Sequence, residues 1–487
     1  MKVRWVFILF GILGSVIVCY SQQYYSKIFF NDSIGQNGKE VYLIGGDMYI
    51  LSGRRCLPDF QDCSSFIKLD SDGEIVFEIL LPDLDVGNDN ALLFWNASFY
   101  VTGHRNRIDQ NIGYYFYEVS LGGEILDFNH IPLEYTSSTN YTSAIDISTS
   151  MLYMCGAADT NGSDPAIDVD GIITSYNLIT GESEVEQYDL GNQFLDVVDM
   201  HPDTDSTLVF LSRRRGIDYD SGYLDWVIEK IYPDGTRQEI HKTENLQSSD
   251  VDIPEFGVLN NGNMVFHLGD HNNATIQFRV LDSEGNFLFD TELENSFWPN
   301  FAFCIDIQPL ADNGFLVVGN YINRVDPIEK LGENNGMLLK IDEYGEIVWL
   351  HHYRHVHPEN GEYRESILGE AKEMDNGDIV AIGSVTGSYT SDLWLLKVNS
   401  DGCLAEGECG QLVTAVEQVQ MVKKYITIYP NPASAGQFIN VLYDKNKVKP
   451  TSIILRSRDG HIVREIDYDT MSNQVSTDGL VPGLYIY

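Results

Sequence analysis

Arginine is the residue type whose placement could support binding chemistry in this sequence. Most of the twelve arginines between residues 22 and 411 fall in segments that we expect to be long loops. Those in the loops are Arg54, Arg55, Arg105, Arg107, Arg213, Arg214, Arg215 and Arg324. A guanidinium group binds a carboxylate or sulfate through two parallel hydrogen bonds, so a face carrying these side chains would suit an acidic glycan or protein. The alternative is that each arginine pairs with a loop acid and serves only the structure.

A second candidate site is a segment rich in oxygen ligands. Its potential ligands are Asp159, Asn161, Asp164, Asp168 and Asp170. Calcium prefers such ligands, but the segment lacks the Asp-x-Asp-x-Asp-Gly spacing and the final Glu of a calcium-binding loop. A solvated turn is therefore the alternative. The sequence predicts no other cofactor, and calcium is the ion to test first.

Four histidines, His351, His352, His355 and His357, are a third candidate. Alternate residues of an extended segment point to one side, so His355 and His357 could share a metal. No acid or cysteine in the sequence around them completes a ligand set, and an exposed polar strand end is the alternative.

Recognised catalytic motifs are missing from the sequence. It has no Gly-x-Ser-x-Gly, His-Glu-x-x-His or Gly-x-x-x-x-Gly-Lys pattern, and these motifs mark common hydrolases and nucleotide-binding enzymes. We therefore predict that the protein is not an enzyme. The 72 acidic residues still offer many carboxylate pairs, so a polysaccharide hydrolase or lyase is the alternative.

The chain is strongly acidic, with 31 Lys and Arg against 72 Asp and Glu and a net charge of −41. Such a surface repels phosphate backbones and anionic lipid headgroups. We predict that neither nucleic acid nor a membrane is a partner. The hydrophobic content of 43% is enough for a folded core.

Residues 1–21 have the features of a Sec signal peptide. A short basic region and an apolar run of 14 residues precede Cys19-Tyr20-Ser21, which supplies small residues for cleavage. In the alternative, Cys19 is acylated as in a lipoprotein, although Val18 stands where Gly or Ala is expected. We expect a secreted or cell-surface protein, and an oxidising compartment that allows disulfides.

The cysteines divide into two groups. Two pairs flank short loops and are predicted to form local disulfides, namely Cys403 with Cys409 and Cys56 with Cys63. Cys155 and Cys304 lie in apolar, strand-like runs and are predicted to be buried free thiols.

An internal repeat predicts the fold. Two strands joined by a tight turn that ends in Gly recur at spacings of 50 to 60 residues. The turn glycines are Gly73, Gly123, Gly181, Gly235, Gly285, Gly345 and Gly402. Each is expected to take a positive φ, which side chains resist. Another apolar strand, usually closed by Gly as in residues 49–53, precedes each turn. Units of four strands, a to d, repeated seven times predict an all-β fold with a seven-bladed β-propeller over residues 22–411.

The ends of the propeller are predicted to close the ring. The last unit has no strand d after Cys403, whereas residues 24–30 lie before the first unit and are similar to the strand d at residues 349–353. The N-terminal strand would therefore complete blade seven and remove two open sheet edges.

Residues 412–424 are predicted to be a linker and residues 425–487 a small β-sandwich. This second segment holds two motifs, Tyr429-Pro430-Asn431-Pro432 and Gly479-Leu480-Val481-Pro482-Gly483-Leu484-Tyr485. They resemble the type A C-terminal sorting domain of the type IX secretion system of Bacteroidetes. The propeller units also resemble repeats of secreted proteins of that phylum, as in residues 392–397. The resemblance implies passage through the type IX machinery and release or attachment at the cell surface. The family continues to a basic tail where this chain stops at Tyr487, so we expect an incomplete sorting domain.

Strand order predicts where a ligand would bind. The a–b and c–d connections are short turns on one face, and the long b–c and d–a connections share the opposite face. Binding sites lie preferentially on long loops of a rigid scaffold. We expect a non-enzymatic protein that recognises a glycan or another protein on its long-loop face. A structural surface component without a specific ligand is a further alternative.

Overall fold

The protein is all-β in the part that the computed structural model describes. The described residues are 24–30, 35–56, 61–82, 84–86, 90–105, 113–133, 137–159, 169–188, 195–203, 207–215, 223–232, 236–247, 255–270, 275–294, 301–324, 332–356, 363–386, 391–405, 408–409, 412–413, 416–420, 426–429, 438–443, 452–457, 462–467, 474–476 and 485–486. Within these ranges, no helix is long and apolar enough to cross a membrane. The chain divides into two compact units, Met1–Val419 and Gln420–Tyr487.

The first unit is built from antiparallel sets of consecutive strands. The first set holds β2 (Gln36–Ile44), β3 (Asp47–Cys56), β4 (Gln61–Leu69) and β5 (Ile75–Leu81). The second holds β6 (Asp85–Val86), β7 (Leu92–Trp95), β8 (Ser98–Arg105), β9 (Gly113–Ser120) and β10 (Ile125–Pro132). The third holds β11 (Ser137–Asp146), β12 (Met151–Asp159), β13 (Val169–Asn177) and β14 (Ser183–Tyr188). The fourth holds β15 (Leu195–Pro202), β16 (Leu208–Arg215), β17 (Tyr223–Ile231) and β18 (Arg237–Gln247).

The remaining sets follow the same plan. The fifth holds β19 (Phe256–Val258), β20 (Met264–Asp270), β21 (Thr275–Leu281) and β22 (Phe287–Glu294). Two further sets share one sheet through a two-residue ladder between β26 and β27. They are β23 (Phe301–Pro309), β24 (Phe315–Arg324), β25 (Gly332–Ile341) and β26 (Ile347–Val356), then β27 (Tyr363–Glu373), β28 (Ile379–Thr386), β29 (Ser391–Val398) and β1 (Tyr25–Phe30).

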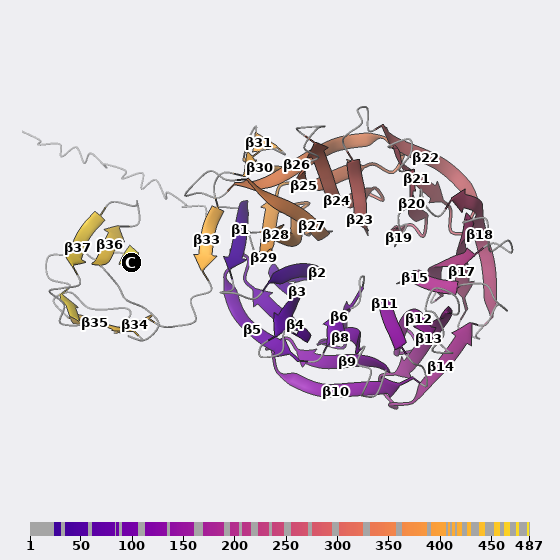
Figure 1. The fold of residues 1–487 in the computed structure, drawn as a ribbon, viewed down its shortest axis with the longest axis horizontal. Helices are drawn as coiled ribbons and strands as arrows, with labels where there is room; N and C mark the ends of the chain where they lie inside the picture. Colours follow the sequence, from indigo (N-terminus) through magenta and orange to yellow (C-terminus); the bar gives the residue numbers. More distant parts are fainter. Residues whose placement is uncertain are drawn as a thin grey trace, which may run out of the picture. The chain divides into compact units, whose positions relative to one another are not determined.

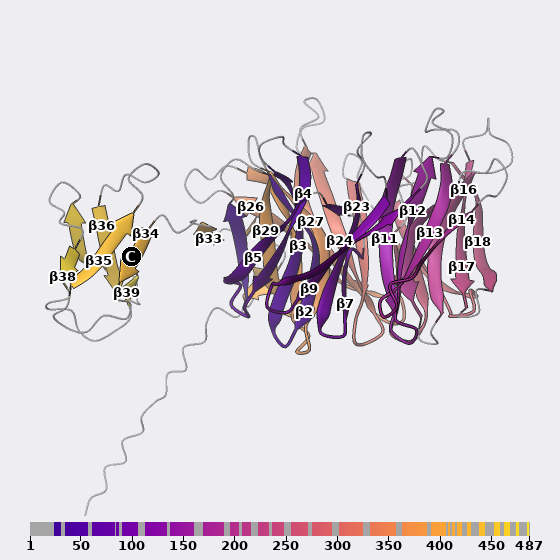
Figure 2. The same cartoon turned by 90° about the horizontal axis from the view of Figure 1, so that it is seen from below.

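The sets stand around a common axis. Figure 1 shows the first strand of each set nearest the centre and the last strand at the rim. Figure 2, turned by 90°, shows the strands running along the axis. The all-β propeller predicted from the repeat is therefore confirmed. The count of seven blades stays a prediction, because two of the sets are joined in one sheet.

The N-terminal strand closes the last set, as predicted. β1 pairs antiparallel with β29, with Ile28 opposite Trp394. The indole N–H of Trp394 donates to Ser26 Oγ at 2.8 Å, and both residues are buried. On the opposite face of β1, the Lys27 ammonium lies 2.6 Å from Glu74 Oε1 and from the Asp72 carbonyl oxygen, in the turn that follows β4. One strand therefore joins the last set to the first.

The turn glycines have the predicted conformation. Six of the seven lie in the described residues and have φ between +73° and +87°, while Gly235 lies outside them. Space is a second reason for glycine here, because the preceding set covers the turn. A Cβ on Gly123 would lie 2.8 Å from the ring of Phe77, and one on Gly345 would lie 2.6 Å from the ring of Phe289.

The glycine predicted to close strand b lies inside the strand, as Gly319 does in β24 and Gly383 in β28, and it has a different role. The inner strands β23 and β27 each carry a bulge, between Cys304 and Asp306 and between Leu368 and Glu370. A Cβ on Gly383 would overlap the carbonyl oxygen of Ile367, just before the second of these bulges. Gly319 stands in the same relation to Phe303. The missing side chain therefore gives the bulged inner strand room to approach strand b.

The cysteines agree with the predictions where they are described. Cys403 and Cys409 form a disulfide between β30 (Cys403–Ala405) and β31 (Glu408–Cys409). Cys155 and Cys304 are buried free thiols. Cys63 is disulfide-bonded, and the side chain of its predicted partner, Cys56, lies outside the described part.

The predicted linker contains two short strands. β32 (Leu412–Val413) pairs in parallel with β26, and β33 (Val416–Gln420) is the neighbour of β1 in its sheet.

The second unit has two three-stranded antiparallel sheets. One holds β34 (Ile426–Tyr429), β35 (Phe438–Tyr443) and β38 (Gln474–Ser476). The other holds β37 (Ile462–Asp467), β36 (Ser452–Ser457) and β39 (Tyr485–Ile486).

The close contact between Gly383 and the bulge of β27 predicts that alanine is more destabilising at Gly383 than at Gly53. Gly383→Ala forces β27 away from β28, so we expect a loss of about 2–3 kcal/mol in the free energy of unfolding. Gly53 lies in β3 one residue past Ser52, which faces the bulge of the first set, and the nearest atom to a Cβ on Gly53 is Lys39 Cε at 3.6 Å. Gly53→Ala should therefore change stability by less than about 1 kcal/mol. Urea denaturation of both variants checks this, and equal losses would contradict it.

Candidate functional site

Bulges place polar side chains on the propeller axis. Five described inner strands shift register once, and the shift always falls just before one polar residue. These residues are Glu40, Thr142, Asp199, Asp306 and Glu370. A bulge turns the following side chain relative to the sheet, and here four of the five turned side chains are acids. We call Glu40, Asp199, Asp306 and Glu370 the axial acids.

Two axial acids tie neighbouring sets together. Glu370 Oε2 accepts a hydrogen bond from the backbone N–H of Val41 on β2. Glu40 repeats this contact one set further on, because its Oε1 accepts from Ala91 N–H and its Oε2 accepts from Leu92 N–H at 2.6 Å. Both glutamates are buried, so these contacts satisfy polar groups on each side of the boundary.

Asp199 is the centre of a second group of contacts. Its Oδ1 accepts from Asn90 Nδ2 at 3.1 Å, from Thr142 Oγ1 at 3.0 Å and from its neighbour Met200 N–H at 2.7 Å. His201 Nε2 lies 2.9 Å from Asp199 Oδ2 and 3.0 Å from the Phe256 carbonyl oxygen. Asp199 therefore links three sets across the axis.

Asp306 has a less complete environment. Its Oδ1 accepts from Gln308 Nε2 at 2.8 Å. The Gln308 side-chain oxygen accepts from Lys372, whose ammonium also lies 2.8 Å from Glu370 Oε1. Asp306 Oδ2 is buried and has no hydrogen-bond partner.

Two cavities adjoin these side chains. A cavity of about 200 Å³ is lined by Glu40, Glu370, Lys372 and His201, and by the half-buried rings of Tyr42 and Phe94, whose centroids lie 5.6 Å apart. Its lining follows the inner strands toward the short a–b turns. A cavity of about 10 Å³ lies among all four axial acids. The axis therefore combines carboxylates, an ammonium group, an imidazole and aromatic faces.

Burial shifts the pKa values of these groups. Burial and the nearby charge of Glu370 raise the pKa of Glu40 to about 8 and that of Asp306 to about 7. Burial also raises the pKa of Glu370, although the Lys372 charge opposes this. For His201, burial lowers the pKa, but the Asp199 carboxylate outweighs it and the pKa is raised overall. Carboxyl groups that titrate near neutral pH are typical of functional sites, and of buried structural networks.

Most side chains of the sequence-predicted sites lie outside the described part. This holds for seven of the eight candidate arginines, for all five potential calcium ligands from Asp159 to Asp170, and for the side chains of the two sorting motifs. The prediction that these arginines lie in loops is wrong for seven of them, because strand b of each set runs past the residue expected to end it. The backbone of β3, β8, β16 and β24 includes Arg54, Arg55, Arg105, Arg213, Arg214, Arg215 and Arg324. Arg214 is described. Its guanidinium lies 2.8 Å from Glu229 Oε2 and 3.5 Å from Glu239 Oε2, which matches the structural alternative for this arginine.

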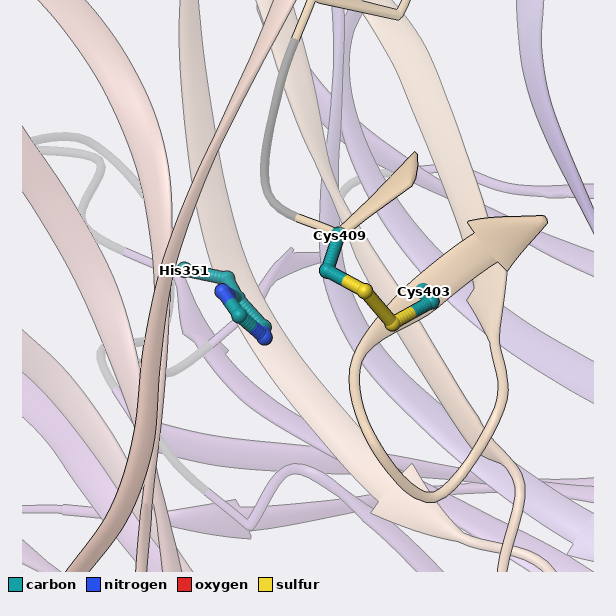
Figure 3. Close-up of side chains that lie close together, drawn as sticks. All are labelled: His351, Cys403 and Cys409. Atoms are coloured by element: carbon teal, nitrogen blue, oxygen red, sulfur yellow. A yellow bond between two sulfur atoms is a disulfide. The ribbon is translucent and has the colours of Figure 1, made fainter. Parts of the chain in front are cut away.

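The described histidines His351, His352 and His355 do not form a metal site together. His352 stacks on Tyr321 with ring centroids 4.0 Å apart, His355 is buried, and His357 lies outside the described residues. His351 points toward the Cys403–Cys409 disulfide, and its donor atom lies within 4.8 Å of both sulfurs (Figure 3). Because the sulfurs are bonded to each other, they are not thiolate ligands in this state.

The axial acids were missed at the sequence level, but the sequence carries a signal for them. Each of Glu40, Asp199, Asp306 and Glu370 stands 13 positions before a small residue of strand b, namely Gly53, Ser212, Gly319 and Gly383. Asn90 has the same spacing from Gly103. Alignment of the repeats on that residue places an acid or amide at one recurring position, which residue-type clustering along the chain cannot detect.

Comparison with known proteins identifies the fold but no family. No protein-family model and no curated protein matches the chain. The β-propeller domain of the trilobed protease from Pyrococcus furiosus is 10% identical, with a TM-score of 0.45, over 75% of this chain and 95% of that one. A prolyl endopeptidase is 12% identical, with a TM-score of 0.42, over 73% of this chain and 47% of that one, so the chain spans about half of its length. An ulvan lyase is 13% identical, with a TM-score of 0.37, over 65% of this chain and 86% of that one.

The prediction that the protein is not an enzyme is contradicted by these comparisons. Most of the named structural neighbours are enzymes, including peptidases, a sialidase and a polysaccharide lyase. The absence of a contiguous motif does not exclude catalysis, because catalytic residues are recognised by their geometry and can come from separate parts of a chain. At these identities the likeness shows the fold alone, so no particular activity carries over.

The raised pKa values predict a pH dependence of stability. Glu40 and Asp306 have pKa values of about 8 and 7 in the folded protein, against ordinary values of 4.5 and 3.8. Groups with raised pKa values stabilise the fold fully below the ordinary value, and this contribution is lost as the pH rises through the folded value. We expect the Tm to fall between about pH 4.5 and pH 8, and less steeply in Asp306→Asn. Thermal melts across this range check it, and a Tm that rises instead would contradict it.

Proposed function

We propose that this protein is an exported β-propeller that binds a glycan in the cavity on its axis. The observation that carries the proposal is the lining of the 200 Å³ cavity, where Tyr42 and Phe94 offer ring faces beside Glu370, Lys372 and His201. Sugars pack on aromatic faces while their hydroxyls bond to charged and polar groups. The volume is small for a binding pocket, so it suits one unit or side group of a longer chain.

Export is supported by the sequence and by the chemistry of the cysteines. The signal-peptide features of residues 1–21 and the Cys403–Cys409 disulfide both fit a protein that reaches an oxidising compartment. We propose a secreted or cell-surface location, with the type IX machinery as the partner in export. Transfer of the protein to the medium by a host with that machinery, and its loss when residues 425–487 are deleted, would test this.

A glycan array tests the ligand proposal. The purified mature protein is applied with and without calcium, and the variants Tyr42→Ala and Phe94→Ala are expected to weaken the best signal at least about tenfold, as loss of a buried aromatic contact does. Phe287→Ala is the matched control, because Phe287 is a largely exposed ring on the outer strand β22. Absence of binding to any glycan would reject the proposal.

The same array separates the axial cavity from the long-loop face. Arg213→Glu and Arg215→Glu reverse the charge of two arginines at the end of β16 and spare Arg214, which is already paired with Glu229. We expect these variants to bind like the wild type. If they lose binding while Tyr42→Ala keeps it, the ligand binds on the long-loop face and the axial site is wrong.

A polysaccharide-cleaving activity is the second candidate. It is favoured by His201, Glu370 and Lys372 lining one cavity, since a base, a carboxyl group and a cation are the parts used in proton abstraction or glycoside cleavage. A panel of acidic polysaccharides would be assayed for new reducing ends and for the absorbance of new double bonds. We expect turnover that Lys372→Met abolishes while Lys397→Met, on the outer part of the last set, retains it.

A further inference from the structure

The small cavity on the axis is lined mainly by carboxyl groups. It has a volume of about 10 Å³, enough for about one water molecule or one ion. All four axial acids line it, and Lys39 is the one cationic residue in its lining. Lys372 adds a second ammonium group through its contact with Glu370. Carboxyl groups therefore outnumber ammonium groups around the cavity, and buried carboxylates are costly unless they are compensated.

Hydrogen bonds account for three of the four acids. Glu40 has an N–H donor at each oxygen, Glu370 has Val41 N–H and Lys372, and Asp199 has donors at both oxygens. Asp306 differs, because its Oδ2 is buried and accepts no hydrogen bond. This unpartnered oxygen belongs to a residue that lines the cavity. It is an observation independent of the number of acids, and it concerns one of the residues of the lining.

We propose that a calcium ion binds in this cavity, with Asp306 as its charged ligand. Asn90, Gln308 and Gly369 also line the cavity, and they offer neutral amide and carbonyl oxygens of the kind that calcium accepts together with water. The lining contains no cysteine or histidine, so zinc and copper are disfavoured. One carboxylate with neutral oxygens gives a weak site, in the millimolar range of extracellular calcium modules.

This site is separate from the oxygen-rich loop around Asp164 and from the glycan proposal. The loop follows β12 on the third set, whereas Asp306 lies on the inner strand β23. The ion would link the inner strands that the axial acids already join. Its role is therefore to stabilise the propeller, and it does not depend on a ligand in the larger cavity.

Thermal melts of the mature protein test the proposal. The protein is freed of metal with a chelator and melted in about 10 mM calcium chloride, in the same concentration of magnesium chloride, and in sodium chloride of equal ionic strength. We expect calcium to raise the Tm by at least about 1 °C over both controls, and calorimetry to show binding at this site. Asp306→Asn should remove the rise, and Asp306→Glu should keep part of it.

The controls separate the possible sites. Asp164→Asn combined with Asp168→Asn alters the oxygen-rich loop and should leave the calcium response of Asp306 intact. Asp306→Asn should be no less stable than the wild type without metal, because it removes a buried unpartnered charge; if it does not fold, Asp306→Ser replaces it. A wild type without any calcium response would overturn the proposal, and so would an Asp306→Asn variant that responds like the wild type. Glycan binding can fail or persist in either case, so the two proposals are tested separately.

Discussion

The close contact between strand b and the bulged inner strand is the constraint on which the axis depends. In the sets of Gly319 and Gly383, a side chain on the glycine would overlap the carbonyl oxygen before the bulge. The bulge, in turn, directs Asp306 and Glu370 toward the centre of the ring. In these two sets, a residue without a side chain on one strand leaves room for the bulge that directs a carboxylate on the next. A serine, Ser212, stands at this place in the set of Asp199, so glycine is required only where the strands approach most closely.

Close contacts also require glycine at the rim, but there the neighbouring atoms belong to the preceding set. Turn glycines such as Gly123 need a positive φ, and they also lie against an aromatic ring of the preceding set. Gly73 lies against Tyr25 of β1, so the closing strand contacts the first set through the same kind of turn that the other sets use. The ring is therefore closed by the same kind of contact between a turn glycine and a neighbouring ring that joins other sets. Lys27 and Glu74 add an ion pair.

These two kinds of glycine explain what could be predicted from the sequence. The turn glycines follow a local rule, since a tight turn between two strands requires positive φ wherever it occurs. They therefore predicted the repeat, the strand order and the closing role of residues 24–30. The axial acids obey a rule that involves three strands of two sets, because Glu40 is defined by its contacts with Ala91 and Leu92 on the next set. Such a position is invisible to motif searches, and it emerges only when repeats are aligned on the glycine of strand b. Several arginines are consecutive in the sequence, and this made them candidates for a binding site. Arg214, however, forms ion pairs with glutamates on neighbouring strands, which is a structural role.

The axial acids stabilise the propeller and also offer groups for binding or catalysis. A propeller could be held together at its axis by neutral side chains, and in the third set Thr142 occupies the equivalent position and donates to Asp199. Carboxylates there add a desolvation cost that backbone N–H donors offset for Glu40 and Glu370 but that nothing described offsets at Asp306 Oδ2. Satisfied acids can be explained by packing alone, whereas an unsatisfied one requires a further partner or a proton. Among the axial acids, Asp306 Oδ2 is the oxygen that lacks such a partner within the described residues, so it is the atom at which the axis can accept one.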